Sequence, residues 1–290
     1  MRFRHAAGDF LRRVWHKADQ DQIFFMAGAI AFNVLVAIVP LAIAAVGVAG
    51  FFLLQTGDPA GPVVDYLLSV LPPVSAEFRL EMEGHLNAFI EQATGLFTIG
   101  TLIFAWLATR LIGTLRSALR EIFDIQQDRG IIAGKLFDLQ MVFIAGTLLS
   151  LNIAITVLLE VAARQGLAFV QFGDRQESWA LNMFGTTLAF LTIWSMFILI
   201  YRYLPARRIQ WRTALISASF TAVMFELMKY GFAWYFATYS GYSSTYESLA
   251  SIAIVVIYVY YMAIAFILGG EVGQVYSLHR IRRRQKERLV

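Results

Sequence analysis

The sequence predicts an all-α polytopic membrane protein with six transmembrane helices and both termini in the cytoplasm. Three observations carry this prediction. Of the 290 residues, 58% are hydrophobic and only 15% are charged, against about 25% charged residues in an average soluble domain. The apolar residues gather in runs long enough to cross a bilayer. Lysine and arginine alternate between the two sides of these runs.

Composition narrows the class of protein further. The mean hydropathy is +0.62, so the chain lacks the polar residues that a soluble protein of this size needs to cover its core. It contains no cysteine, which excludes disulfides, thiol catalysis and cysteine-ligated metals. Its first residues show no short apolar core followed by a cleavage site, so we expect no removable signal peptide.

Six apolar runs have the roughly 20 residues that a helix needs to cross a hydrocarbon core about 30 Å thick. They occupy residues 23–54, 94–115, 137–161, 179–203, 213–238 and 249–276. The first run contains Pro40, which we expect to kink a helix that the bilayer can tolerate. Together the runs form a transmembrane domain over residues 22–276.

The direction of each span follows from the positive charges, which are concentrated in cytoplasmic loops. Of the 24 lysines and arginines, all but four lie in the N-terminal segment, the second-to-third connection, the fourth-to-fifth connection or the C-terminal segment. The exceptions are Arg79, Arg164, Arg175 and Lys229, and Lys229 lies inside a span. This alternation at every crossing places both termini on the cytoplasmic side.

The net charge of +4 could point to nucleic acid or to a membrane face. The basic residues sit in short segments next to spans, which favours anionic lipid at the cytoplasmic face and no nucleic acid as partner. Residues 277–290 therefore form a basic cytoplasmic tail. Residues 1–21 have apolar and aromatic side chains at helical spacing, with basic residues on other faces. They predict an amphipathic helix at the membrane interface, the alternative being a helix packed on the protein's own loops.

The longest external connection, residues 55–92, contains four prolines and then apolar residues at helical spacing. We expect a short helical hairpin here, on the non-cytoplasmic side.

Several motifs resemble the YihY/BrkB family of bacterial inner-membrane proteins. They are Ala31-Phe-Asn33 leading to Val39-Pro40-Leu41, the segment from Arg116 to Asp124, the Leu204-Pro205 pair followed by Trp211-Arg212, Tyr246-Glu-Ser-Leu-Ala, and Gly269-Gly-Glu-Val. The resemblance covers nearly the whole chain and marks Pro40, Pro205, Trp211, Arg212 and Tyr246 as motif positions. The sequence departs from the family pattern at Phe225, where Trp is common, and at Glu247, where Gly is common.

This resemblance implies six helices in the inner membrane. Members of this family have been described as a ribonuclease, as a virulence or serum-resistance factor, or as a possible transporter, and the resemblance implies the same set of candidate functions here. A metal-dependent ribonuclease needs clustered metal ligands, and the four histidines are His5, His16, His85 and His279, with no ligand spacing among them. No phosphate-binding loop, nucleophile elbow or paired-carboxylate motif is present either. We therefore expect no enzyme activity, no cofactor and no metal.

Charged residues inside the predicted spans point to a functional site more directly than the motifs do. Glu226 lies 14 residues after Arg212, which is about 21 Å along a helix and past the middle of the bilayer. Lys229 is one helical turn away, so the two residues form either a self-neutralised pair or part of a polar cavity. Other candidates for this intramembrane polar site are Asn33, Arg110 and Glu271, with an Arg110–Glu271 ion pair expected near the cytoplasmic end. Gly269 and Gly273 present a small-residue face that predicts close helix packing.

Two functions fit these features. In the first, the protein is a transporter or flippase-like protein for a lipid or another anionic or amphiphilic solute, with Glu226 at its polar site. In the second, it is a non-transporting membrane scaffold for envelope assembly, and its buried charges are structural. The sequence names neither the substrate nor the oligomeric state.

Overall fold

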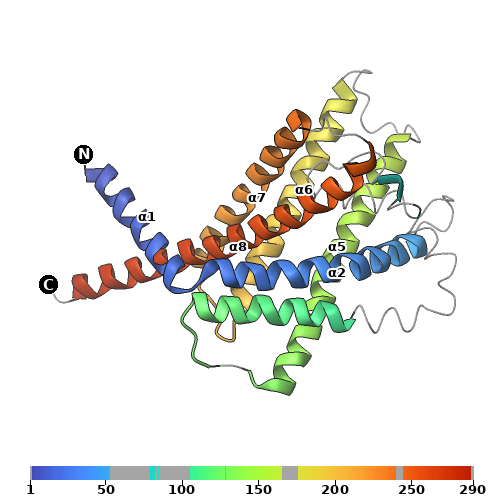
Figure 1. The fold of residues 1–290 in the computed structure, drawn as a ribbon. Helices are drawn as coiled ribbons and strands as arrows, with labels where there is room; N and C mark the ends of the chain where they lie inside the picture. Colours follow the sequence, from blue (N-terminus) through green and yellow to red (C-terminus); the bar gives the residue numbers. More distant parts are fainter. Residues whose placement is uncertain are drawn as a thin grey trace.

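The computed structural model describes residues 2–52, 79–81, 84, 105–127, 129–164, 176–239 and 244–288. Within these ranges every regular element is a helix, which confirms the all-α class (Figure 1). The long helices are α1 (Arg2–Gln20), α2 (Ile23–Phe52), a helix over residues 105–122, α5 (Ile131–Arg164), α6 (Gln176–Tyr203), α7 (Trp211–Tyr239) and α8 (Ser244–Arg288).

Apart from α1, each of these helices overlaps one of the predicted apolar runs. α2 continues as a helix through Pro40, as a membrane span can. The predicted run 94–115 is described only from residue 105 onward. Of the predicted external hairpin 55–92, residues 79–81 and 84 are helical and the rest lies outside the described residues.

Two of the described helices are long and apolar enough to cross a membrane without a break, over Ile131–Leu148 and Ile252–Ile281. The helices Gly8–Gln20 and Ile23–Ile38 are bent by 66° relative to each other, and they would form a third span if the bent pair counts as one span. Phe190–Tyr203 forms a shorter apolar helix. The apolar composition and the helix lengths are thus those of a membrane protein. The count of six spans remains a prediction.

α8 is the central helix of the molecule, packed against α1, α2 and α7 (Figure 1). Its 45 residues would extend about 68 Å, more than twice the thickness of a hydrocarbon core. Between Ala265 and Val275 almost every residue is buried, on all sides of the helix. The remaining C-terminal part, which carries most of the predicted basic tail, projects out of the bundle as a helix.

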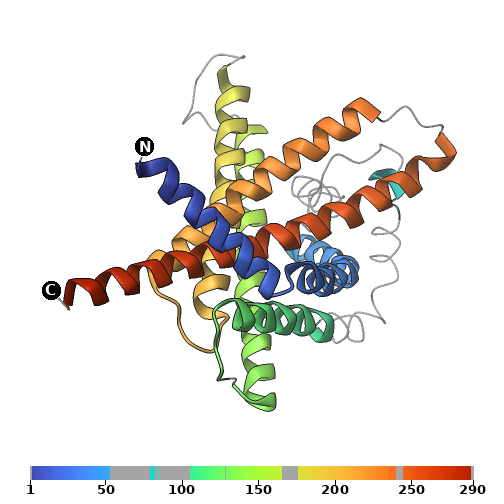
Figure 2. The ribbon, with the colours of Figure 1, turned by 60° about the vertical axis from the view of Figure 1, so that its left-hand side comes forward.

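The N-terminal helix α1 packs on the protein as well as presenting a free face. Val14 and Ala18 are buried, and α1 lies against α8. Trp15, between them in sequence, is 68% exposed. Both views show the free ends of α1 and α8 projecting from the same end of the bundle (Figure 2). The helix predicted over residues 1–21 is therefore present, and it both docks on α8 and keeps an aromatic residue available to a membrane interface.

The contact between α7 and α8 depends on glycine. A Cβ atom added to Gly269 would lie 2.0 Å from Thr221 Oγ1, and one added to Gly273 would lie 1.9 Å from Ser217 Oγ. The close packing predicted from Gly269 and Gly273 is thereby confirmed. Beside it, the buried Tyr201 hydroxyl of α6 donates to the Phe266 carbonyl and shares a 2.7 Å hydrogen bond with Thr221, so three helices meet at this level.

We predict that Gly273→Ala destabilises the fold, because the Ser217 hydroxyl must move and the Thr213 carbonyl, 3.2 Å from the added Cβ, must give way. Overpacking of this kind costs about 1–3 kcal/mol. Thermal unfolding in detergent measures the effect. Ser217→Gly in the same chain should restore much of the stability because it removes the clashing hydroxyl. Gly28→Ala on α2 is the control, since nothing lies within 4 Å of its added Cβ. Equal melting temperatures for the Gly273 and Gly28 variants would contradict the prediction.

Candidate functional site

The four segments that the sequence assigns to the cytoplasmic side meet at one end of the bundle. Lys17 of α1 donates to Asp124, which follows the 105–122 helix, at 3.2 Å. Arg129, in the same connection as Asp124, donates to the carbonyl of Pro205, in the α6–α7 connection, at 3.1 Å. Arg280 of α8 donates to Gln210 at 3.3 Å. These contacts link the four basic segments at one end of the bundle, which we call the basic end.

The Leu-Pro…Trp-Arg motif forms the α6–α7 connection at this end. The Arg202 guanidinium lies 4.0 Å from the centre of the Trp211 ring and donates to the Ile209 carbonyl. Arg129 donates to the carbonyls of Tyr203 and Pro205 and stacks on Phe137, 3.3 Å from the ring centre. The motif therefore closes a tight connection and ties it to the start of α5, and its role here is structural.

A buried ion pair joins the 105–122 helix to α5. Arg116 Nε donates to Asp138 Oδ1 at 3.1 Å, and Asp138 is only 1% exposed. Gly134 makes room for the guanidinium, since a Cβ there would lie 2.9 Å from Arg116 Nη2. Arg116 begins the Arg116-to-Asp124 motif, so the first residue of this motif also has a structural partner.

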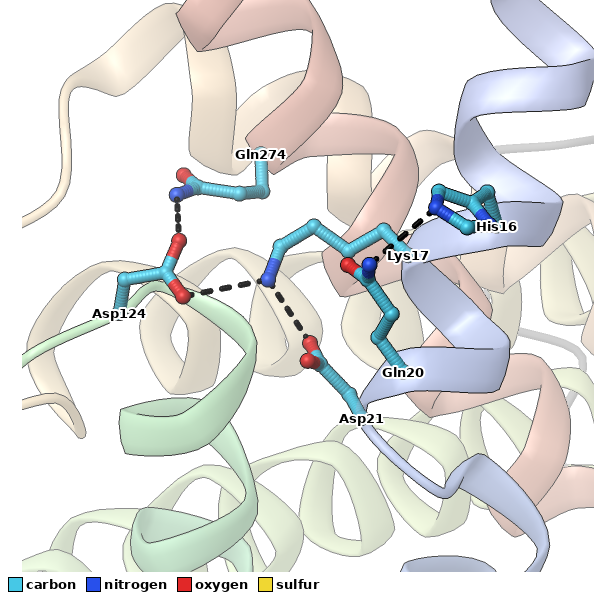
Figure 3. Close-up of polar contacts among 6 residues, drawn as sticks. All are labelled: His16, Lys17, Gln20, Asp21, Asp124 and Gln274. Carbon is cyan, nitrogen blue, oxygen red and sulfur yellow. Dashed lines mark hydrogen bonds and ion pairs between the residues drawn. The ribbon is translucent and has the colours of Figure 1, made fainter.

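Asp124, the last residue of the Arg116-to-Asp124 motif, belongs to a polar cluster at the basic end (Figure 3). Lys17 donates to Asp21 at 2.9 Å and to Asp124 at 3.2 Å, while Gln274 of α8 donates to Asp124 at 3.0 Å. Asp124 has a φ of 51°, a left-handed conformation that aspartate tolerates better than most residues. The cluster thus joins the end of α1, the turn after the 105–122 helix, and α8.

Glu271 lies on α8 one helical turn before Gln274 and is completely buried, with 0% exposure. Within the described part of the chain, neither carboxylate oxygen has a hydrogen bond of good geometry. The charges close enough to act on it are those of Asp21, Lys17 and Asp124. A buried carboxyl group that is surrounded by further carboxylates and lacks a donor needs a physical explanation.

The other intramembrane candidates are not gathered around Glu271. Glu226 and Lys229 form an ion pair of 2.8 Å with side chains 22% and 23% exposed. Asn33 donates to the Ala29 carbonyl of its own helix, and Arg110 is exposed. The expected Arg110–Glu271 pair does not form, because Arg110 points away from the packed face of its helix. Apart from Glu226 with Lys229, no hydrogen bond or ion pair among the described residues joins these candidates.

An apolar groove of about 630 Å³ opens between α7 and α8, at the level of the Glu226–Lys229 pair. By helical spacing, its α7 residues lie on the side opposite that pair. Its lining consists of Leu227, Met228, Gly231, Phe232, Trp234, Tyr235, Ile254 and Ile257. A cavity of this volume is within the range of small-molecule sites.

The described residues contain no group of three or more His, Asp or Glu side chains placed to hold a metal ion.

The remaining motif positions mark connections rather than one site. Arg212 is exposed at the start of α7, next to Trp211. The side chains of Pro40 and Tyr246 lie outside the described residues. Sequence reasoning found Glu271 but missed the residues that surround it. The polar residue Gln274, one helical turn from Glu271, could have indicated a polar cluster on α8. Lys17 and Asp21, in contrast, look like ordinary charged residues of a surface helix.

Comparison with known proteins places this arrangement in a family. The chain matches the family described as Virulence factor BrkB over residues 14–289. It belongs to the BrkB family. The match covers α8 with Glu271, as well as Lys17, Asp21 and Asp124, so the polar cluster lies entirely within the family region.

The following relatives of this BrkB-family chain are described as membrane proteins. A UPF0761 membrane protein of Stenotrophomonas maltophilia (strain R551-3) is 28% identical over 273 residues, covering 94% of this chain and 62% of the relative. One from Pseudoalteromonas translucida is 27% identical over 281 residues, covering 93% and 88%. The chain thus spans less than two thirds of the Stenotrophomonas relative. No solved structure matches it. The family confirms a membrane protein and assigns no enzymatic reaction.

We predict that Arg116→Ala greatly reduces the stability of the fold, because it leaves the buried Asp138 carboxylate uncompensated. Breaking one half of a buried pair costs about 3–5 kcal/mol. The measurements are the yield of monodisperse protein and its melting temperature. The double variant Arg116→Met with Asp138→Leu should be more stable than Arg116→Ala, and Arg207→Ala, which removes an exposed arginine, is the control. A melting temperature unchanged by Arg116→Ala would refute this reading.

Proposed function

We propose that this BrkB-family chain is an inner-membrane transporter or flippase-like protein that handles a lipid or another amphiphilic or anionic solute. Its six helices would leave both termini, and the basic end, in the cytoplasm. The contacts among the four basic segments support this orientation, since lysine and arginine favour the cytoplasmic face. Anionic lipid headgroups would be the partners of the basic end.

The observation that carries the proposal is the lateral groove between α7 and α8. Its lining is apolar and aromatic, and Ile254 and Ile257 belong to the apolar span Ile252–Ile281. A groove at this depth of a membrane protein is surrounded by lipid rather than by water. Its natural occupant is therefore an acyl chain or another apolar tail.

The Glu226–Lys229 pair supplies charge at the same level of α7. An isolated ionised group near the bilayer centre costs about 2.5–3.5 kcal/mol, and pairing removes most of that cost. We propose that the pair provides the polar part of the pathway, on the side of α7 away from the groove. A headgroup would pass on this polar side while the tail stays in the apolar groove.

A second candidate function has an observation in its favour. The 2.8 Å contact neutralises both charges without help from another helix, which suits a purely structural pair. A non-transporting scaffold for envelope assembly needs nothing more. The two functions differ in whether the groove and the pair affect lipid movement, so the following two experiments separate them.

Filling the groove tests the first function directly. We predict that Gly231→Leu reduces the translocation of a fluorescent phospholipid several-fold in reconstituted vesicles, with little effect on stability. The reason is that Gly231 lines the groove and has nothing within 4 Å of an added Cβ. The matched control is Gly146→Leu on α5, which also has open space at its Cβ. If vesicles with the unmodified protein show no translocation above protein-free vesicles, the scaffold function is favoured.

The ion pair is tested by a double-mutant cycle. We predict that Glu226→Gln and Lys229→Met each lower the melting temperature, because each leaves one partly buried charge without its partner. The combined variant should recover stability, since no charge remains. If the pair serves transport, the combined variant folds and still loses lipid translocation. Full translocation by a stable combined variant would remove the pair from the pathway.

A further inference from the structure

The buried carboxyl of Glu271 is not explained by packing or by lipid handling. It has 0% exposure and no hydrogen-bond donor of good geometry among the described residues. The nearby ammonium of Lys17 makes its hydrogen bonds to Asp21 and Asp124 instead. An ionised carboxylate in such a place is strongly destabilising when no donor or counter-charge compensates it.

The charges that surround Glu271 are unbalanced. One ammonium, on Lys17, faces three carboxyl groups, on Asp21, Asp124 and Glu271 itself. α2 contains no ionisable residue, and α7 presents the hydroxyls of Ser217 and Thr213 to this part of α8. A single proton on Glu271 would remove one excess negative charge and would turn the carboxyl into a donor.

A neighbouring carboxylate and an opening to water both lie beside Glu271. The Asp21 carboxyl lies close enough to interact with Glu271, although the two are not in hydrogen-bonding geometry. The Asp124 side chain is 62% exposed, so the cluster opens to the aqueous phase at the basic end. The same cluster contains the end of α1, whose Val14 and Ala18 are buried against the bundle.

We propose that Glu271 is a proton-binding site that latches the N-terminal helix onto α8. In the latched state Glu271 is protonated and neutral, so only the carboxylates of Asp21, at the end of α1, and Asp124 face the ammonium of Lys17. When the proton leaves through the exposed Asp124, three carboxylates face one ammonium and repel each other, so α1 separates from α8. Since the latched state binds one more proton than the released state, alkaline pH favours release. This proposal is independent of the proposed transport function.

The absence of native cysteine makes the latch measurable with single cysteines. Ala18→Cys places a small thiol at a buried position of α1, and Trp15→Cys places one at an exposed position of the same helix. The rate of maleimide modification in detergent is measured from mildly acidic to alkaline pH. Every thiol reacts faster at high pH because the thiolate is the nucleophile, so the quantity to follow is the ratio of the rate at position 18 to that at position 15.

We expect this ratio to rise several-fold toward alkaline pH in the otherwise native chain. Glu271→Gln cannot lose a proton and keeps an amide donor, so the ratio should stay low at every pH. Glu121→Gln, which removes an exposed carboxylate from the 105–122 helix, should leave the native profile unchanged. A flat profile in the native background, or a rising one in Glu271→Gln, overturns the proposal.

A second measurement does not depend on the folding of Glu271→Gln. Infrared spectroscopy of the native chain at neutral pH should show the C=O stretch of a protonated carboxyl that exchanges slowly with deuterium. The band should disappear over the same pH range in which position 18 becomes reactive. If no protonated carboxyl is detected at neutral pH, Glu271 is ionised in the latched state and the proposal fails.

Discussion

The close contact between α7 and α8 is the constraint on which the rest of the structure depends. Gly269 and Gly273 let the two backbones approach, and the hydroxyls of Ser217 and Thr221 fill the space that side chains would otherwise need. Between helices in a bilayer, apolar burial gives little driving force, so tight packing and hydrogen bonds must hold the bundle together. The hydroxyl of Tyr201 adds α6 to this contact.

This packing gives the two ends of α8 different environments. Around Ala265–Val275 the helix is enclosed on all sides, which is where a carboxyl such as Glu271 can be kept from water. Toward Ile254 and Ile257 the helices diverge enough to leave the apolar groove. One long helix therefore links a groove suited to apolar tails with a polar cluster at the basic end, and a change in its packing could affect both.

Much of the fold was predictable, because a membrane imposes simple rules on a sequence. Apolar length predicted the helices, and the glycine spacing at Gly269 and Gly273 predicted a close contact. The prediction of an Arg110–Glu271 ion pair was wrong. Similar depth in the membrane does not determine which face of a helix meets its neighbour. Asp138 was not predicted as the partner of Arg116 for the same reason: the two are 22 residues apart and belong to helices whose rotation is set by packing.

The sequence by itself determined that this is a helical membrane protein of the BrkB family, because helix length, charge distribution and motifs are properties of the chain alone. Only the tertiary structure decided how its charges are used. It joined Arg116 to Asp138 on the neighbouring helix, and it enclosed Glu271 with Lys17 and Asp21 from the other end of the chain. Side chains so distant in sequence become neighbours only when helices pack, and it is that burial which makes a carboxyl group expensive to ionise.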